Sequence, residues 1–127
     1  MRLDCDVIQA DGGTRTASIT GAYVAAHLAF QGVRRLGLIK EIPLTQPVAA
    51  ISCGIYEGEA VLDLDYAEDS NAGADANFVL AGNGGIVEVQ ATAEDVPFDR
   101  ASYDQMFALA EKGCKELFAK QREALGL

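Results

Sequence analysis

The feature that most constrains this fold is a segment near the N-terminus, where alternating apolar residues run into two glycines and then into a long helical pattern. The alternation over Leu3–Ala10 predicts a β-strand. Gly12 and Gly13 predict a tight turn, because glycine adopts backbone conformations that other residues avoid. The sequence therefore predicts a strand–turn–helix junction over residues 3–18.

The start of the predicted helix has the chemistry of an anion-binding site. Backbone N–H groups at a helix N-terminus lack partners and carry a partial positive charge, and glycines let the backbone approach an anion closely. Arg15 adds a planar fork of donors that suits phosphate oxygens. The alternative is an ordinary junction capped by neighbouring hydroxyls, with Arg15 in solvent. Such glycine-rich junctions are weak motifs, so local chemistry leaves both interpretations open.

A long helix is expected to follow the turn. Periodic apolar residues predict that it runs from about Thr16 or Ala17 to Leu36, with Gly37 as its stop. Its buried stripe is expected to consist of Ile19, Tyr23, Ala26, Phe30 and Val33. A connector with two prolines then occupies residues 37–47.

The remainder of the chain is expected to form a β-rich unit closed by a second long helix. Two hairpins are predicted, with strands at Val48–Tyr56, Ala60–Asp65, Asn77–Ala81 and Ile86–Thr92. Between them, residues 66–76 are acidic and turn-rich, with room for one short helical turn. The last helix is expected to start near Asp99 or Ser102, where Ser102 and Gln105 fit a capping box, and to fray at Gly126.

Carboxylates gather in the segment between the two predicted hairpins. Five fall within thirteen residues: Asp63, Asp65, Glu68, Asp69 and Asp75. Grouped carboxylates on a loop are hard oxygen ligands of the type that Mg²⁺ or Mn²⁺ prefers, although the spacing does not match an EF-hand. The alternative interpretation is a solvated acidic loop that holds no metal.

Composition limits the classes of function. The chain has 127 residues, enough for one compact domain with a core. Its net charge of −9 argues against a dedicated nucleic-acid binder with a basic surface. No apolar run approaches the length of a membrane span, and no basic-then-apolar leader precedes the first predicted strand. We therefore expect a soluble, cytoplasmic protein.

The cysteines and the single histidine suggest no metal site. Cys5, Cys53 and Cys114 lack zinc-ligand spacing and are expected to be small buried side chains in a reducing compartment. His27 has no nearby partner in sequence and is assigned no catalytic role.

Three stretches closely resemble the bacterial ribonuclease PH family: Asp4–Ala22, Leu62–Ser70 followed by residues 75–77, and Val87–Glu94. Members of this family are phosphate-dependent exoribonucleases that trim the 3′ ends of tRNA precursors. The resemblance continues to the C-terminus and matches only the second half of the family's chain. In the third stretch, Glu88 and Gln90 share one strand face, which is open to an active-site role or a structural one.

The resemblance implies a set of site residues and co-substrates. The implied phosphate-binding residues are Gly13, Thr14 and Arg15. The implied catalytic and metal-binding residues are Asp69 and Asp75, with Asp63 as a further candidate ligand. The implied metal is Mg²⁺ or Mn²⁺. Inorganic phosphate would attack the last phosphodiester of the RNA, and a nucleoside diphosphate would leave.

The resemblance also implies a fold and partners. The fold class is α/β (α+β), with mixed sheets that carry helices on their faces. Residues 1–42 would belong to a first subdomain, of the ribosomal protein S5 domain 2 type, and residues 43–127 to the second. The family forms hexameric rings. Because half of the family's chain would leave a strand edge exposed, we expect pairing with the N-terminal half as a separate chain, or self-association. The alternatives are a non-catalytic ring subunit of an exosome-like RNA-processing assembly and an inert truncated fragment.

Overall fold

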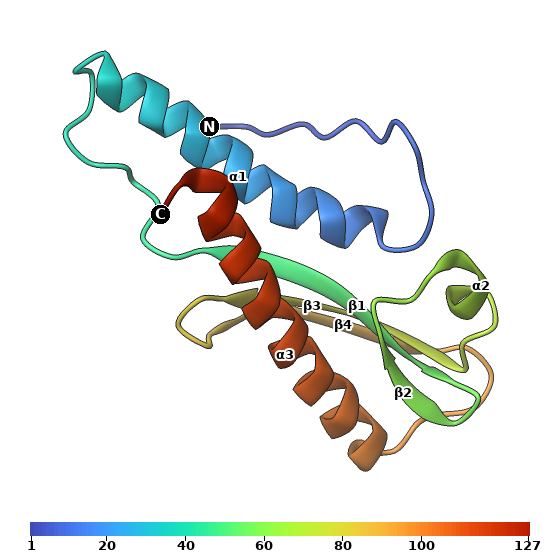
Figure 1. Cartoon of the computed structure of the whole chain (residues 1–127). Helices are drawn as coiled ribbons and strands as arrows, with labels where there is room; N and C mark the ends of the chain where they lie inside the picture. The colour runs from blue at the N-terminus through green and yellow to red at the C-terminus, as the bar shows by residue number, and fades with distance from the viewer.

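The computed structural model describes all 127 residues, which form one four-stranded sheet and three helices (Figure 1). In chain order the elements are α1 (Thr14–Arg35), β1 (Val48–Tyr56), β2 (Glu59–Leu62), α2 (Tyr66–Asp69), β3 (Ala74–Ala81), β4 (Ile86–Ala93) and α3 (Arg100–Leu125). The strand order is β2-β1-β3-β4, and every pairing is antiparallel. The predicted α/β (α+β) class is confirmed, and within this chain the sheet is antiparallel throughout.

The two hairpins form where the alternating pattern predicted them. β1 and β2 are joined by a turn at Glu57 and Gly58, whose φ angles of 51° and 84° suit the tight two-residue turns that match the twist of a hairpin. β2 ends at Leu62, before the predicted end at Asp65. β3 begins at Ala74, earlier than predicted, so Asp75 lies on a strand and not in a loop.

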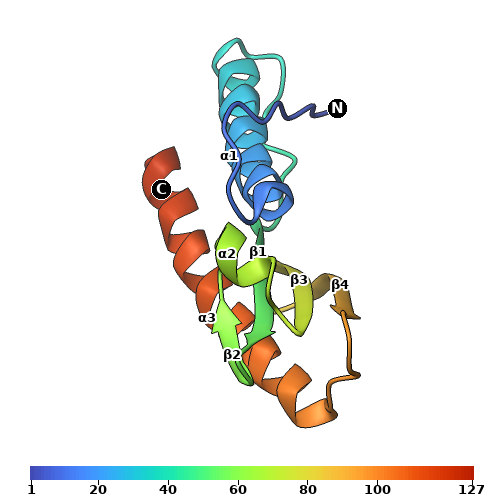
Figure 2. The same ribbon diagram turned by 90° about the vertical axis from the view of Figure 1, so that its right-hand side faces the viewer.

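The hydrophobic core lies between the sheet and α3, which crosses one face of it (Figure 2). Side chains alternate across a strand, so one set from β1 and β3 faces this helix. The core consists of Ala49, Ile51, Cys53, Ala76, Phe78, Leu80, Met106, Ala110 and Cys114. Phe78 is fully buried, and its ring lies 5.6 Å from the ring of Phe107 in an edge-on contact. Burial of these apolar surfaces is the main stabilising contribution to the unit.

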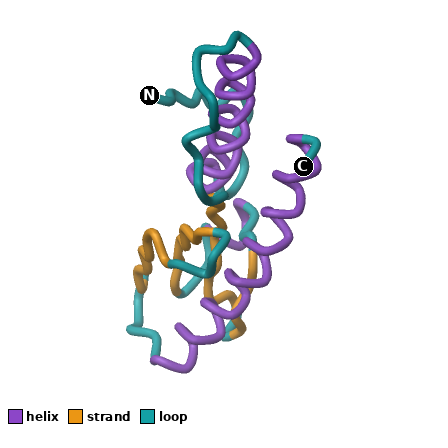
Figure 3. The backbone as a smooth tube through the Cα atoms, turned by 90° about the vertical axis from the view of Figure 1, so that its left-hand side faces the viewer, coloured by secondary structure: helices purple, strands orange, loops and turns teal.

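Side-chain hydrogen bonds attach α1 to the sheet. The pairing of β2 with β1 stops at Cys53, so the backbone of Ala50 has no strand partner on that side. The Thr20 hydroxyl replaces it, accepting a hydrogen bond from the Ala50 N–H at 3.0 Å and donating to the Ala50 carbonyl oxygen at 3.2 Å. Gln121 of α3 donates to the carbonyl oxygens of Thr20 and Val48. As Figure 3 shows, α1 therefore lies beyond the strands, with α3 passing beside both.

The helix ends agree with the predictions only in part. α1 begins at Thr14, two or three residues before the predicted start, and ends at Arg35, one residue before the predicted end at Leu36. Gly37 follows the helix as predicted, with φ of +73°. α3 is capped by Asp99, whose carboxylate accepts a hydrogen bond from the Ser102 N–H, so the predicted Ser102–Gln105 capping box is wrong. Of the predicted α1 stripe, only Ala26 is fully buried, because one side of α1 has no neighbour in this chain.

The predicted strand over Leu3–Ala10 is absent. Residues 1–10 run beside α1, away from the sheet, and every one of them is exposed (Figure 1). A strand needs a neighbouring strand to accept and donate its backbone hydrogen bonds, and α1 separates this segment from the sheet. Local alternation of apolar residues therefore predicted an extended segment correctly but not its pairing.

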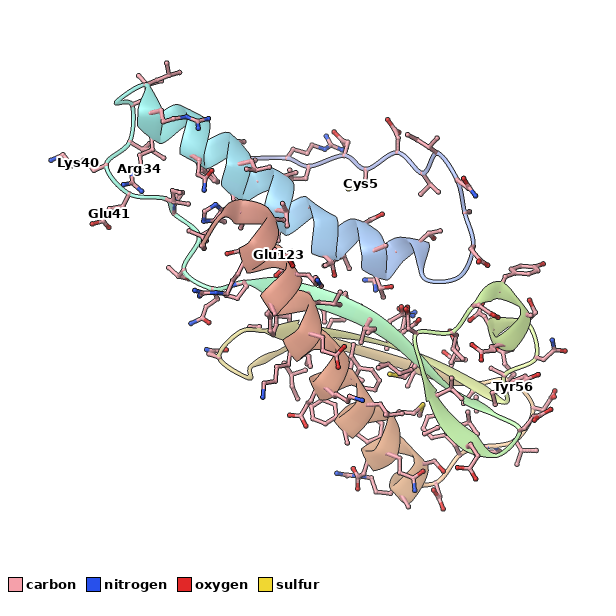
Figure 4. The ribbon with its side chains drawn as sticks, in the orientation of Figure 1. Cys5, Arg34, Lys40, Glu41, Tyr56 and Glu123 are labelled. Carbon is pink, nitrogen blue, oxygen red and sulfur yellow. The ribbon has the colours of Figure 1, made fainter.

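The cysteines differ from the expectation at one position. Cys53 and Cys114 are buried as predicted, but Cys5 is exposed on the N-terminal segment (Figure 4). Burial raises the pKa of Cys53 to about 12 and that of Cys114 to about 11. No helix in the chain combines the length and apolar composition needed to cross a bilayer.

Candidate functional site

One cavity brings together most of the predicted site residues. Its volume is about 180 Å³, and it lies where the start of α1 meets the acidic segment and the middle of the sheet. Of the six predicted site residues, five line it: Gly13, Thr14, Arg15, Asp69 and Asp75. Arg15 is the one basic residue in its wall.

The N-terminus of α1 presents uncapped N–H groups to this cavity. Gly13 precedes the helix with φ of 70°, and no side chain caps the first turn. The hydroxyls of Thr16 and Ser18 donate to carbonyl oxygens, those of Gly13 and Thr14 respectively, and so leave the N–H groups uncapped. Of the two interpretations that the sequence left open, capping by hydroxyls is therefore not what forms. The helix start keeps its capacity to bind an anion.

The turn before α1 is held against the acidic segment by two residues. A Cβ atom on Gly12 would overlap the Leu64 carbonyl oxygen, so only glycine lets the two backbones approach this closely. The Asp11 carboxylate accepts a hydrogen bond from the Tyr66 N–H at 3.1 Å, across 55 positions of sequence. The sequence pattern gave no signal for this role of Asp11, because the contact joins segments that are distant along the chain.

The five clustered carboxylates separate into different environments. Asp65 and Glu68 form a capping box at the start of α2, so both have a structural role. Asp63 lines a neighbouring cavity with Gly12 and Gly13 and does not line the one that holds the other predicted residues. Asp69, at the end of α2, and Asp75, on β3, remain beside the helix start.

The strand register gives the sheet a polar face on the side opposite α3. Residues directly opposite each other in antiparallel strands project to the same face. Ser52 of β1 pairs with Asn77 of β3, which pairs with Gln90 of β4. Ser52 and Asn77 both line the cavity, and neither was predicted as a site residue.

Arg15 forms an ion pair with a residue of β4. Its Nη2 atom donates to both carboxylate oxygens of Glu88, at 2.8 Å and 3.0 Å. Both of its side-chain hydrogen bonds come from this one nitrogen, which leaves Nε and Nη1 available for another anion. The two side chains are about half exposed (49% and 42%), so the pair itself contributes at most roughly 1 kcal/mol to stability.

The carboxylates in the cavity wall fit a magnesium ion whose remaining ligands are oxygens of a bound phosphate and water. No group of three or more histidine, cysteine, aspartate or glutamate side chains lies close enough to hold a metal by itself. Mg²⁺ commonly takes one or two protein carboxylates and fills its remaining positions with substrate phosphate oxygens and water. Asp69 and Asp75 match that pattern, whereas a three-carboxylate site that includes Asp63 does not form.

Comparison with known proteins finds relatives of this chain. Residues 46–113 match the 3′ exoribonuclease family, domain 2. The chain is 62% identical over 125 residues to Ribonuclease PH of Rhodospirillum rubrum, covering 98% of the chain and 52% of that relative. It is 60% identical over 124 residues to Ribonuclease PH of Caulobacter vibrioides, with the same coverage of 98% and 52%. The chain thus spans about half the length of the curated relatives it matches.

Solved structures share the fold at lower sequence identity. Rice (Oryza sativa) Rrp46 superposes with a TM-score of 0.71 and 22% identity, over 92% of this chain and 50% of that one. A chain of the Archaeoglobus fulgidus exosome, solved with RNA bound to the active site, gives a TM-score of 0.54 and 15% identity, over 69% and 35%. At these identities the likeness concerns the fold alone. The match over residues 46–113, more than half of the chain, establishes that this chain belongs to the 3′ exoribonuclease family.

Proposed function

We propose that this chain carries the phosphate- and metal-binding part of a phosphate-dependent 3′-to-5′ exoribonuclease. The substrate would be the 3′ end of a tRNA precursor, and the products would be nucleoside diphosphates. One observation carries the proposal: the uncapped start of α1, Arg15, Asp69 and Asp75 all line a single cavity. The relatives named Ribonuclease PH support the same reaction class.

The reaction is a transfer of the terminal nucleotide to phosphate. An oxygen of inorganic phosphate forms a bond to the phosphorus of the last phosphodiester, and the bond from that phosphorus to the preceding 3′ oxygen breaks. The shortened RNA keeps that oxygen as a hydroxyl, and the terminal nucleotide departs as a nucleoside diphosphate. Because phosphate is already an anion, no dedicated general base is needed.

The main obstacle is bringing two anions together, and the cavity residues lower it. The N–H groups after Gly13 and the free nitrogens of Arg15 hold the attacking phosphate. Asp69 and Asp75 would hold Mg²⁺ or Mn²⁺, which when bound would offset the negative charge that develops on the transferred phosphorus. A carboxyl of this pair that is protonated, and so does not bind the metal, would deliver the proton that the departing 3′ oxygen requires.

The RNA-binding surface is proposed to come largely from residues outside these 127. The chain has a net charge of −9, and Arg15 is the one basic residue that lines the cavity. Arg34 and Lys40 lie at the opposite end of α1, far from its start (Figure 4). A nucleic-acid interface normally has several basic residues gathered beside the site.

The N-terminal segment supports the same proposal. Residues 3–9 and small residues of α1 line an open hollow of about 460 Å³, and the backbone of this extended segment has no strand neighbour. We propose that residues 1–42 and 43–127 are parts of two subdomains. The half of the relatives' length that this chain does not match would complete the first subdomain, supplied as a separate chain. Self-association of this chain is the alternative, and in either case the assembly would be a hexameric ring.

Three free thiols are consistent with a cytoplasmic location.

The direct test measures release of nucleoside diphosphate from a short RNA, with and without inorganic phosphate. The chain is assayed alone and mixed with the remaining half of the Rhodospirillum rubrum relative. We expect phosphate-dependent release in the mixture, and roughly a 10²–10³-fold loss in Arg15→Ala, because that change removes a donor aimed at the reacting phosphate. Arg34→Ala, the same substitution at the far end of α1, is the control and should leave the rate unchanged. Release that does not depend on inorganic phosphate, or that persists in Arg15→Ala, would rule the proposal out.

A further inference from the structure

A buried hydroxyl in the wall of the cavity has no hydrogen-bond partner. Ser52 lies in the middle of β1 and is only 8% exposed, and its Oγ atom neither donates nor accepts a hydrogen bond within the chain. Two other buried side-chain atoms lack partners, on His27 and Gln121, but only Ser52 lines the cavity. Buried polar atoms in folded proteins are nearly always hydrogen-bonded, so this exception requires a reason.

Packing alone does not explain a serine at this position. The neighbouring residues of β1 that face α3 are apolar, and an alanine at position 52 would fit the same space without burying an unpartnered hydroxyl. A partner outside the chain does explain it, because a bound molecule in the cavity can accept the hydrogen bond that Ser52 has available.

The position of the hydroxyl indicates what that molecule is. Its Oγ lies 3.7 Å from the point where a Cβ atom on Gly13 would sit, so it is beside the start of α1. The donors around it are the uncapped first turn and Arg15, which together favour an acceptor with several negatively charged oxygens. A phosphate group has this chemistry.

We infer that Ser52 is a further phosphate-binding residue, whose hydroxyl donates a hydrogen bond to the inorganic phosphate held by Gly13, Thr14 and Arg15. The inference rests on the proposed function and adds a contact from the sheet to those from the helix. Phosphate would then be held from two directions, which fixes its orientation for attack.

The experiment titrates inorganic phosphate into the full 127-residue chain by calorimetry, in the presence of Mg²⁺. Ser52→Ala should bind phosphate about tenfold more weakly, since a hydrogen bond to a charged oxygen is lost. Ser52→Thr keeps the hydroxyl and should retain most of the affinity. Ser18→Ala is the matched control, because the Ser18 hydroxyl already donates to the Thr14 carbonyl oxygen at 2.8 Å and does not line this cavity.

Thermal unfolding without phosphate separates a binding role from a structural one. Ser52→Ala should unfold at the same temperature as the unsubstituted chain or higher, because it removes a buried hydroxyl that has no partner. A lower unfolding temperature together with unchanged phosphate affinity would overturn the inference, since the hydroxyl would then act in folding only.

Two further outcomes distinguish this inference from the proposed function. If Arg15→Ala loses phosphate binding and Ser52→Ala keeps it, the phosphate site stands and the role of Ser52 is refuted. If the unsubstituted chain binds no phosphate, both the inference and the proposed function fail.

A parallel titration with a short RNA tests the other source of phosphate oxygens. If Ser52→Ala binds RNA more weakly but binds inorganic phosphate with unchanged affinity, the assignment to the attacking phosphate is likewise overturned.

Discussion

At the scale of single residues, the Arg15–Glu88 pair sets the availability of the one cation in the cavity wall. Glu88 has two opposite effects on a bound phosphate: its charge repels the anion, while its oxygens hold Arg15 Nη2 and orient the fork. Glu88→Gln removes the charge and keeps an acceptor for Arg15, whereas Glu88→Ala removes both. We expect the alanine variant to bind inorganic phosphate about threefold more weakly than the glutamine variant, as a calorimetric titration of each will measure.

The comparison of glutamine with alanine removes the charge from the argument, because both variants are neutral at position 88. The same two substitutions at Glu111, an exposed residue of α3 outside the cavity, should give equal affinities. Equal affinities at position 88 would mean that Glu88 is only a nearby surface charge and does not position Arg15.

The site residues were predictable from the sequence to different degrees. Resemblance pointed to Asp69 and Asp75, and the structure brings both to one cavity with Arg15. Composition alone could not separate them from Asp65, which has the same carboxyl group but caps α2. The unpartnered hydroxyl of Ser52 had no local signature at all, because a serine in an apolar strand looks ordinary until the strand's neighbours are known.

At the scale of elements, Gly12 controls how closely the turn approaches the acidic segment. In Gly12→Ala the new Cβ atom would overlap the Leu64 carbonyl oxygen and lie 3.1 Å from the Cα atom of Asp65. Both contacts are with backbone, which cannot move aside cheaply. We expect Gly12→Ala to lower the free energy of unfolding by about 1–3 kcal/mol in urea denaturation, and to weaken phosphate binding as the two halves of the cavity separate.

Gly32→Ala, within α1, is the matched control for this substitution. Nothing lies within 4 Å of the position that its Cβ atom would take. Alanine favours the helix more than glycine does, so this variant should be more stable by up to about 1 kcal/mol. Similar losses in both variants would show that close approach is not what Gly12 provides.

Periodicity predicted the elements whose apolar faces pack within this chain. The strand at Val48–Tyr56 and the long helix at the C-terminus formed as expected, because each has a continuous apolar face that packs within this chain. The strand expected at Leu3–Ala10 failed because pairing is non-local, and its alternating pattern does not specify a neighbour. The contact between Asp11 and Tyr66 could not be predicted either, because it joins segments that are distant along the chain.

At the scale of the whole molecule, the reactivity of the three thiols toward an alkylating reagent tests whether a partner covers the N-terminal segment. Cys5 is exposed there, whereas Cys53 and Cys114 are buried with pKa values raised to about 12 and about 11. Thiolate is the reactive form, and a raised pKa keeps these two thiols protonated at neutral pH. We expect one fast-reacting thiol in the folded chain, measured with an alkylating reagent and mass spectrometry, and three after unfolding in denaturant.

Adding the remaining half of the Rhodospirillum rubrum relative should then slow the alkylation of Cys5. The slowing is expected because a strand or sheet from that half would cover residues 3–9, where Cys5 lies beside α1 with its Sγ atom 3.9 Å from the Ser18 carbonyl oxygen. Cys5→Ser provides the control, since it should abolish the fast reaction and leave the other two thiols unreactive. A Cys5 rate that stays the same in the mixture, at concentrations where the two chains co-elute, would mean that the partner binds elsewhere. The exposed segment would then not be the surface that completes the first subdomain.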